Sequence, residues 1–176
     1  MTDLIILALL SPGPKHGYQL KREAGWIFGQ ESLHNNLVYP MLRRFLKEGW
    51  ATKKSVSGER GQNRQQYSLT ARGRQTLLAR LSSYSEADVR SVEGFHVRVG
   101  LFELLEPEVR ERILSLREAY LRSQVETMSA LQAHMDVGTY GGEVVRHRQD
   151  KMQLELNWIR RLRRFVKSNS KEGRVS

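Results

Sequence analysis

The sequence predicts a mainly α-helical protein with one small β-hairpin, built from an N-terminal domain at residues 1–84 and a helical domain at residues 85–167. Three observations support this prediction. Apolar residues recur at steps of three or four through most of the chain, which is the period of an amphipathic helix. One stretch near residue 60 instead has two strand-like segments around a glycine-containing loop. Positive charge is concentrated before residue 85, where 13 basic residues stand against 5 acidic ones, whereas 16 and 14 follow.

The N-terminal segment, Leu4 to Leu10, is an unbroken apolar run. By periodicity it is either a strand or a buried helix, and we favour a helix that ends before Pro12 and Pro14. The run is far shorter than the ~20 residues that a membrane-spanning helix needs, and the acidic Asp3 precedes it where a secretory signal carries positive charge. Since the chain also has no cysteine, these features predict a cytoplasmic protein. A second helix is predicted to follow, with His16 at its entrance.

The segment from Asn35 to Gly49 predicts a third helix with two different faces. Asn is a preferred N-cap, and a glycine suits the left-handed turn that ends a helix. Because proline is tolerated without cost only in the first turn, Pro40 indicates that the regular part begins after Asn35. Apolar residues recur on one side, at Val38, Met41, Leu42 and Phe45. A polar and cationic set lies largely off that stripe, at Asn35, Asn36, Tyr39, Arg43 and Lys47.

Residues 51–69 predict a β-hairpin. Ala51 to Val56 mixes β-branched and charged residues, a polar loop with glycines follows, and Arg64 to Leu69 alternates again. Thr70 can cap a further helix after the hairpin. Three helices, a cationic hairpin and a fourth helix are the element order of a winged helix-turn-helix domain.

Residues 85–167 predict helices alone. Ala87 to Leu105 has apolar residues at steps of three or four, weakened by two glycines. Pro107 suits the first turn of a long helix, which the glycines of residues 138–142 end. A last apolar stripe runs from Val145 to Val166.

The two long helices are expected to form an antiparallel hairpin with broad apolar surfaces that a small N-terminal domain cannot cover. A partner is therefore predicted, and a second copy of the chain is favoured over a monomer because two-fold homodimers are the commonest soluble oligomers. The polar residues 168–176 are predicted to be a disordered tail.

Enzyme motifs are not found. The chain has no hydrolase elbow, phosphate-binding loop or dinucleotide fingerprint, so we expect neither an enzyme nor a cofactor. Three residues, His134, Asp136 and His147, could surround a metal, but they lack compact ligand spacing and are better explained as surface residues. Four arginines are most simply the solvated face of the last helix, although they could also lie near nucleic acid: Arg160, Arg161, Arg163 and Arg164.

Three motifs are specific as a set. They are His16-Gly17-Tyr18-Gln19-Leu20, then Val38-Tyr39-Pro40 with Leu42, Arg44 and Gly49, and finally Tyr67-Ser68-Leu69-Thr70 with Gly73. In order and spacing they resemble the PadR family of transcriptional repressors. The resemblance covers Leu4 to about Leu81 and extends more loosely to the helical second half. The chain departs from the family's usual residues at Asn36, Leu37 and Leu46.

The resemblance implies that the third helix enters the DNA major groove and that the hairpin, the wing, follows the backbone or the minor groove. Within that frame, Asn36 could pair with adenine, and the arginines of the third helix reach phosphate in preference to guanine. The residues predicted to contact DNA are Tyr18, Asn35, Asn36, Val38, Tyr39, Arg43, Arg44, Lys53, Lys54, Arg60, Gln62, Asn63 and Arg64. Two alternatives stay open, namely that the wing is a solvated charged turn and that the two tyrosine rings belong to the core.

The predicted partners are a palindromic operator duplex, a second copy of the chain and, by resemblance, a small aromatic effector. Four rings could line an effector pocket, although aromatic residues at helical spacing more often fill a core: Phe95, Phe102, Tyr120 and Trp158. An effector would release DNA by favouring a dimer with wrongly spaced recognition helices. The alternative function is a protein-interaction scaffold that uses the helical hairpin without binding DNA.

Overall fold

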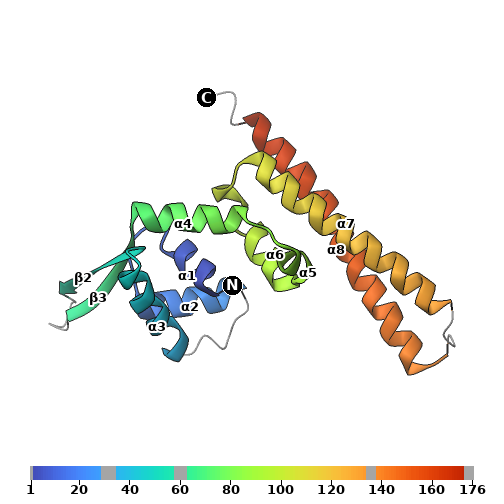
Figure 1. The fold of residues 1–176 in the computed structure, drawn as a ribbon, viewed down its shortest axis with the longest axis horizontal. Helices are drawn as coiled ribbons and strands as arrows, with labels where there is room; N and C mark the ends of the chain where they lie inside the picture. Colours follow the sequence, from blue (N-terminus) through green and yellow to red (C-terminus); the bar gives the residue numbers. More distant parts are fainter. Residues whose placement is uncertain (1, 29–34, 58–62, 134–137, 173–176) are drawn as a thin grey trace. The chain divides into compact units, whose positions relative to one another are not determined.

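The computed structural model describes residues 2–28, 35–57, 63–133 and 138–172, which form a mainly helical fold with one small sheet (Figure 1). The chain divides into two compact units, one of residues 1–84 and 96–104 and the other of residues 85–95 and 105–176. The first unit contains α1 (Thr2–Leu9), β1 (Lys15–His16), α2 (Gly17–Phe28), α3 (Asn35–Lys47), β2 (Ala51–Ser57), β3 (Asn63–Leu69), α4 (Ala71–Ser82) and the 3-10 turn η1 (Phe102–Leu104). The second contains α5 (Glu86–Arg90), α7 (Pro107–Gln132) and α8 (Tyr140–Glu172), and α6 (Val92–Val99) crosses the boundary.

Helix α1 is the centre of the first unit, and the predicted helix at Leu4 to Leu10 is confirmed. Its side chains are buried all round, with Ile5, Ile6 and Leu7 at 0% exposure. The helix packs against both α2 and α4, so it has no solvated face to show amphipathic periodicity. Each such aliphatic side chain stabilises the fold by roughly 2 kcal/mol relative to exposure.

Helix α3 ends as its sequence predicts. Gly49 has a φ of 70°, in the left-handed region. Its N–H donates to the carbonyl of Leu46 (3.2 Å) and the N–H of Trp50 donates to that of Phe45 (2.8 Å), which is the Schellman pattern. The expectation for the start of this helix is wrong, because α3 begins at Asn35 and holds Pro40 in its interior. The buried apolar stripe retains the helix despite the N–H that proline lacks.

The predicted hairpin is confirmed, and it belongs to a three-stranded antiparallel sheet of order β1-β3-β2. In the hairpin the register runs from Ala51 opposite Leu69 to Ser57 opposite Asn63. The short strand β1 was not expected. Its His16, predicted at a helix entrance, pairs with Gln66 on the other edge of β3. The wing is therefore tied on both sides to the helical core.

Thr70 joins the wing to the end of α3. Its hydroxyl accepts from the N–H of Gly73 (2.9 Å), which confirms the predicted cap of α4, and donates to the carbonyl of Gly49 (2.7 Å). Gly73 is required here because a Cβ would lie 2.0 Å from the carbonyl oxygen of Trp50. This close backbone approach holds the start of α4 against the segment that joins α3 to the wing.

Residues 86–104 differ from the single amphipathic stretch that periodicity predicts. They form α5, α6 and η1, because serines cap two separate helices. Ser85 and Asp88 make a capping box on α5. The hydroxyl of Ser91 accepts from the N–H of Gly94 (2.9 Å) at the start of α6. A side chain that caps a helix competes with continuation of the preceding one.

Helices α7 and α8 form the predicted antiparallel hairpin of the second unit (Figure 1). Helix α7 begins at Pro107 as expected, and α8 begins at Tyr140, inside the predicted glycine break, where Thr139 accepts from the N–H of Gly142 (3.1 Å). Helix α8 runs to Glu172, into the segment predicted to be a disordered tail, and residues 173–176 lie outside the described part. None of the helices in the described ranges is long and apolar enough to cross a bilayer.

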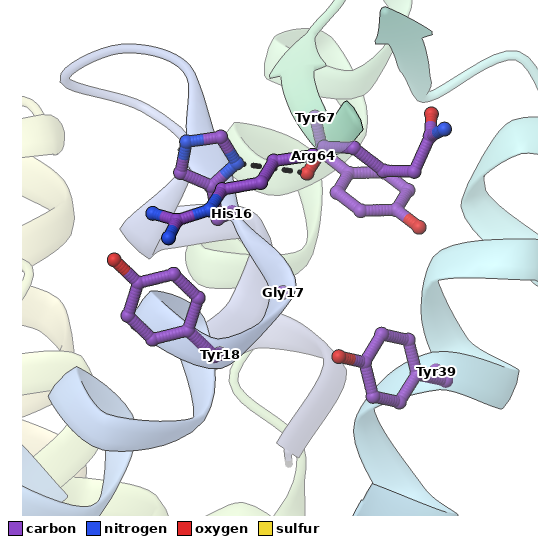
Figure 2. Close-up of a pocket in the computed structure, with 7 residues that line it drawn as sticks. His16, Gly17, Tyr18, Tyr39, Arg64 and Tyr67 are labelled. Carbon is purple, nitrogen blue, oxygen red and sulfur yellow. Dashed lines mark hydrogen bonds between the residues drawn. The ribbon is translucent and has the colours of Figure 1, made fainter. Parts of the chain in front are cut away.

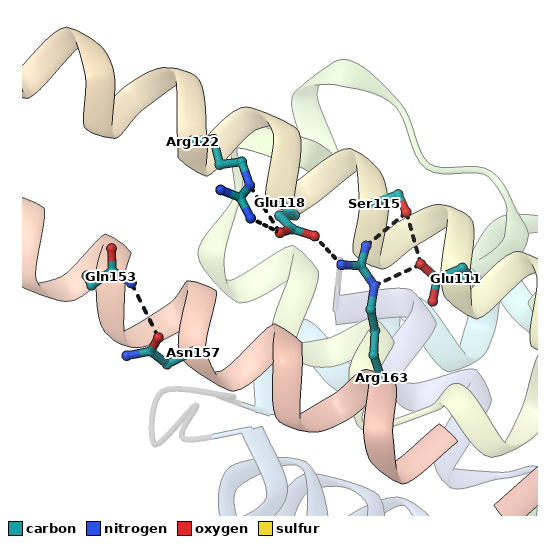
Figure 3. A network of polar contacts seen from close by, with 7 residues as sticks. All are labelled: Glu111, Ser115, Glu118, Arg122, Gln153, Asn157 and Arg163. Carbon is teal, nitrogen blue, oxygen red and sulfur yellow. Dashed lines mark hydrogen bonds and ion pairs between the residues drawn. The ribbon is translucent and has the colours of Figure 1, made fainter. Parts of the chain in front are cut away.

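A charged network fastens the two long helices (Figure 3). The guanidinium of Arg163 on α8 donates to Glu111 (2.8 Å), Ser115 (3.0 Å) and Glu118 on α7. Glu118 also accepts from Arg122 (2.6 Å). Burial alone would raise the pKa of Glu118, but the two guanidinium partners hold that pKa below its usual value. Ion pairs therefore join α7 and α8 on the solvent-facing side of the hairpin, in addition to the apolar packing between the two helices.

The interior of this hairpin contains one buried ion pair. Arg117 is 1% exposed and forms a bidentate contact with Glu155 at 2.8 and 3.0 Å. Its remaining amino group donates to the carbonyl of Val89 on α5. The guanidinium lies 5.5 Å from the ring centroids of both Phe95 and Tyr120. A fully partnered guanidinium of this kind can be accommodated inside a helical unit.

Candidate nucleic-acid interface

Helix α3 separates its side chains into a core face and a solvent face. Val38, Leu42 and Phe45 are buried at 1%, 0% and 0% exposure. Tyr39 and Arg43, one helical turn apart, are exposed on another side of the helix. The core face fixes the helix in the unit, so the exposed face is held in a definite position.

The exposed tyrosine borders a groove of about 590 Å³. The groove is lined by His16, Gly17, Tyr18, Tyr39, Arg64, Gln65 and Tyr67. These residues come from four elements, β1, the start of α2, α3 and β3. Figure 2 shows Tyr18 and Tyr39 on opposite sides of Gly17, with Arg64 beside His16. Two tyrosines, a guanidinium and an imidazole therefore line one groove.

Gly17 makes the close approach of α2 and α3 possible. A Cβ at this position would lie 2.8 Å from Cε1 of Tyr39, closer than van der Waals contact allows. The tyrosine ring is the end of a flexible side chain, so a larger residue at Gly17 would displace it and reshape the groove. The small residue between His16 and Tyr18 is thus a determinant of the site.

Tyr67 forms the buried wall of the groove at 8% exposure. Burial raises the pKa of its phenol, and neighbouring Tyr39 raises that pKa further, while the charge of Arg43 lowers it. Tyr67 is therefore a neutral hydroxyl at physiological pH. The Tyr67 phenol therefore interacts electrostatically with Tyr39 and Arg43 on the exposed face of α3.

The groove and its surroundings are electropositive. None of the seven lining residues carries a carboxylate. Arg43, Lys53, Lys54 and Arg64 are exposed, and in the part of the chain that the structure describes none of them forms an ion pair. Unpaired cations beside tyrosine hydroxyls are the composition that binds a phosphate backbone.

The wing divides its cations between two faces. Lys53 stands opposite Tyr67 and Lys54 opposite Gln66, and alternation along β2 sends the two lysines to opposite sides of the hairpin. A DNA backbone that lies on one side of the hairpin could therefore be contacted by only one of the two lysines. The tip of the wing, with predicted contacts Arg60 and Gln62, lies outside the described residues.

Two predicted DNA contacts have other roles. Val38 is buried, so its side chain packs in the core and cannot reach DNA. Arg44 lies one residue round the helix from Arg43 and pairs with Asp3 of α1 at 3.1 Å. Arg80 of α4 pairs with the same carboxylate. Burial alone would raise the pKa of Asp3, but these guanidinium groups help hold that pKa below its usual value.

Asn35, Asn36 and Asn63 lie within α3 and β3, but their side chains are outside what the structure describes. The adenine contact predicted for Asn36 therefore stays a prediction. The metal alternative also falls outside the described part at His134 and Asp136, and no group of three metal-ligating side chains occurs in the described residues.

The four rings predicted to line an effector pocket are not gathered in one unit. Phe95, Tyr120 and Trp158 belong to the second unit, and Phe102 to the first. Phe95 meets Trp158 edge to face at 5.7 Å and is fully buried beneath Arg117. Phe95 and Tyr120 flank the buried guanidinium of Arg117, and Tyr120 and Trp158 are half-buried.

Sequence reasoning missed four members of the groove, namely His16, Gly17, Gln65 and Tyr67. Their signal was present in the alternation of β3 and in the His-Gly-Tyr run, but only the pairing of β1 with β3 brings them to Tyr39.

Comparison with known proteins finds one family model and several solved structures that are similar to this chain. A sequence model of the "Transcriptional regulator PadR-like family" matches residues 6–79. No curated protein matches the chain. Among solved structures, a transcriptional regulator from Thermoplasma acidophilum is 29% identical over 43% of this chain and 72% of its own, with a TM-score of 0.41.

The PadR protein of Bacillus subtilis matches over nearly the whole chain. Its complex with operator DNA is 17% identical over 93% of this chain and 98% of its own, with a TM-score of 0.47. Its complex with p-coumaric acid is 16% identical over 94% of each chain, with a TM-score of 0.41.

Proposed function

We propose that this chain is a dimeric, sequence-specific DNA-binding repressor released by a small-molecule effector. The match of residues 6–79 to the sequence model of the PadR-like family of transcriptional regulators supports this proposal. The description of this family is that of transcriptional regulators, so the proposed role is regulation of transcription. The proposal gives α3 the role of the recognition helix and the β2–β3 hairpin the role of the wing.

The single observation that carries the proposal is the carboxylate-free groove beside an exposed arginine that forms no ion pair with any residue the structure describes. Tyr18, Tyr39 and Arg64 line the groove and Arg43 continues the same face of α3. Hydroxyls and guanidinium groups at fixed positions bind phosphate oxygens and set the register of a protein on a duplex. Base reading then falls to the N-terminal part of α3, since the first residues of a recognition helix contact base edges.

Exposed apolar side chains on the α7–α8 hairpin support the dimer. Leu116 is 40% exposed, Val144 55% and Leu154 66%. A symmetric second copy would cover such side chains, and a two-fold dimer would present two recognition helices to half-sites about 34 Å or a multiple of that apart.

The proposed effector would be a small aromatic molecule. Phe95 and Tyr120 contact Arg117, and Trp158 packs on Phe95, so an aromatic ligand would have to enter this cluster by displacing one of the rings. Such a ligand would act only if it bound one arrangement of the dimer better than the other.

A salt series of duplex binding tests the proposal. Fluorescence anisotropy would compare a duplex from the region upstream of the chain's own gene with a scrambled duplex of equal length. Specific binding should exceed scrambled binding, and log affinity should fall with log salt with a slope of about −0.9 per phosphate neutralised. Equal affinity for the two duplexes would contradict sequence specificity, and sedimentation of a monomer at micromolar concentration would contradict the dimer.

A further inference from the structure

His16 lines the groove and has a defined tautomer. Its Nδ1 lies 3.0 Å from the carbonyl oxygen of Gln65. A carbonyl only accepts hydrogen bonds, so Nδ1 must donate, and the neutral ring carries its proton there. The ring is further oriented by stacking on Tyr18, with centroids 6.0 Å apart and planes 8° from parallel.

The second ring nitrogen is the atom available to a ligand. Nε2 makes no hydrogen bond to any described residue. In the neutral ring Nε2 can only accept a hydrogen bond, so its lone pair would repel a phosphate oxygen. In the protonated ring it becomes a cationic donor directed by the fixed Nδ1 contact. The same imidazole therefore either repels or binds a phosphate, depending on one proton.

The surroundings of His16 favour an anion when one enters the groove. Arg64 from β3, Tyr18 and Tyr39 line the same groove as His16, with Tyr67 as the neutral wall. Lys54 shares the sheet face of His16, because both pair with Gln66. The nearest carboxylate on α2, that of Glu23, is occupied by Lys15 at 2.6 Å and does not line the groove.

We propose that His16 is a phosphate-contacting residue of the DNA interface and that duplex binding is coupled to uptake of a proton by its imidazole. This inference rests on the DNA-binding function proposed above. An opposite charge within hydrogen-bond distance favours the charged form of a histidine, so a phosphate in the groove draws a proton onto Nε2. By linkage, the duplex then binds more tightly as the pH falls through the range in which histidine titrates.

Calorimetry measures the coupled proton directly. Titrations of the full chain with the duplex, at one pH near 7 in buffers of different ionisation enthalpy, give the number of protons taken up per protomer. We expect net uptake, together with an affinity that is tighter at about pH 6 than at about pH 8 by a factor of about ten per ring, the size of one charge-assisted hydrogen bond. The variant His16→Gln should bind the same duplex with the uptake removed.

Two controls separate this role from a structural one. His147→Gln removes an exposed imidazole on α8 and should leave proton uptake as in the unmodified chain. The shift of the His16 ring carbons in NMR spectra, with and without duplex at constant pH, should move to that of imidazolium on binding and needs no variant.

The outcomes distinguish the inference from the function on which it rests. Duplex binding with equal proton uptake in the unmodified chain and His16→Gln, or an unchanged His16 ring signal, would overturn the inference alone. Failure of the unmodified chain to bind duplex at any pH would overturn the proposed function and this inference with it.

Discussion

Replacing Arg43 with glutamine should weaken duplex binding, whereas the same change at the adjacent Arg44 should not. Arg43 is exposed and has no ion-pair partner among the described residues, while Arg44 Nη2 lies 3.1 Å from Asp3 Oδ2. One phosphate contact contributes about −0.9 to the slope of log affinity against log salt, which amounts to about fivefold between 1 M and 0.15 M salt. Arg43→Gln should cost about that factor per protomer, or about 25-fold for a two-fold dimer.

Arg44→Gln should instead affect folding. The ion pair joins side chains that are 49% and 21% exposed, and Asp3 keeps Arg80 as a partner. Such a pair contributes about 0.5 kcal/mol, which lowers Tm by about 2 °C.

Anisotropy titrations between about 50 and 200 mM salt would give both the affinity and its slope, and thermal melts would give the stability. The assignment of faces on α3 is refuted if Arg44→Gln reduces the salt slope as much as Arg43→Gln does.

Three further changes test the packing and the charges. Gly73→Ala should lower the free energy of unfolding by about 3 kcal/mol, because the added Cβ would meet the Trp50 carbonyl. Gly13→Ala is the control: a Cβ there would have no other atom within 4 Å, so the urea midpoint should stay unchanged. The Asp3 carboxylate stabilises the fold above its ordinary pKa, and this contribution is lost as the pH falls through its lowered folded-state pKa. The urea midpoints of Asp3→Asn and of the unmodified chain should therefore differ at neutral pH and converge in acid. A difference that stays constant with pH would contradict this. Arg117→Met should cost about 3–5 kcal/mol by leaving the Glu155 carboxylate unpaired, and adding Glu155→Leu should restore much of it; equal melts for the single and double variants would refute the account.

The helices and the hairpin of the first unit were predictable because local sequence features specify them. Gly49 ends α3 with a positive φ, and Thr70 caps α4, as their residue types indicate. Pro107 likewise begins α7. Where periodicity misled, at residues 86–104, serine caps had divided an apparently continuous stripe into separate helices. A cap is a local signal that outweighs the spacing of apolar residues.

The candidate site was only partly predictable. Exposed Tyr18, Tyr39, Arg43 and Arg64 follow from the two-faced helix and the cationic wing. The separation of Arg43 from Arg44 does not, because it depends on the carboxylate of a residue more than forty positions away.

The sequence by itself determined the kinds and order of the elements, the two-faced character of helix α3 and the concentration of positive charge before residue 85. These properties arise from periodicity, capping and composition, which act over a few residues. Only the tertiary structure decided which cations stay free and that His16 joins Tyr39 in one groove, since strand pairing and ion pairs bring together residues that are distant in the chain. Such contacts are fixed by packing of the whole unit, and no short stretch of sequence contains them.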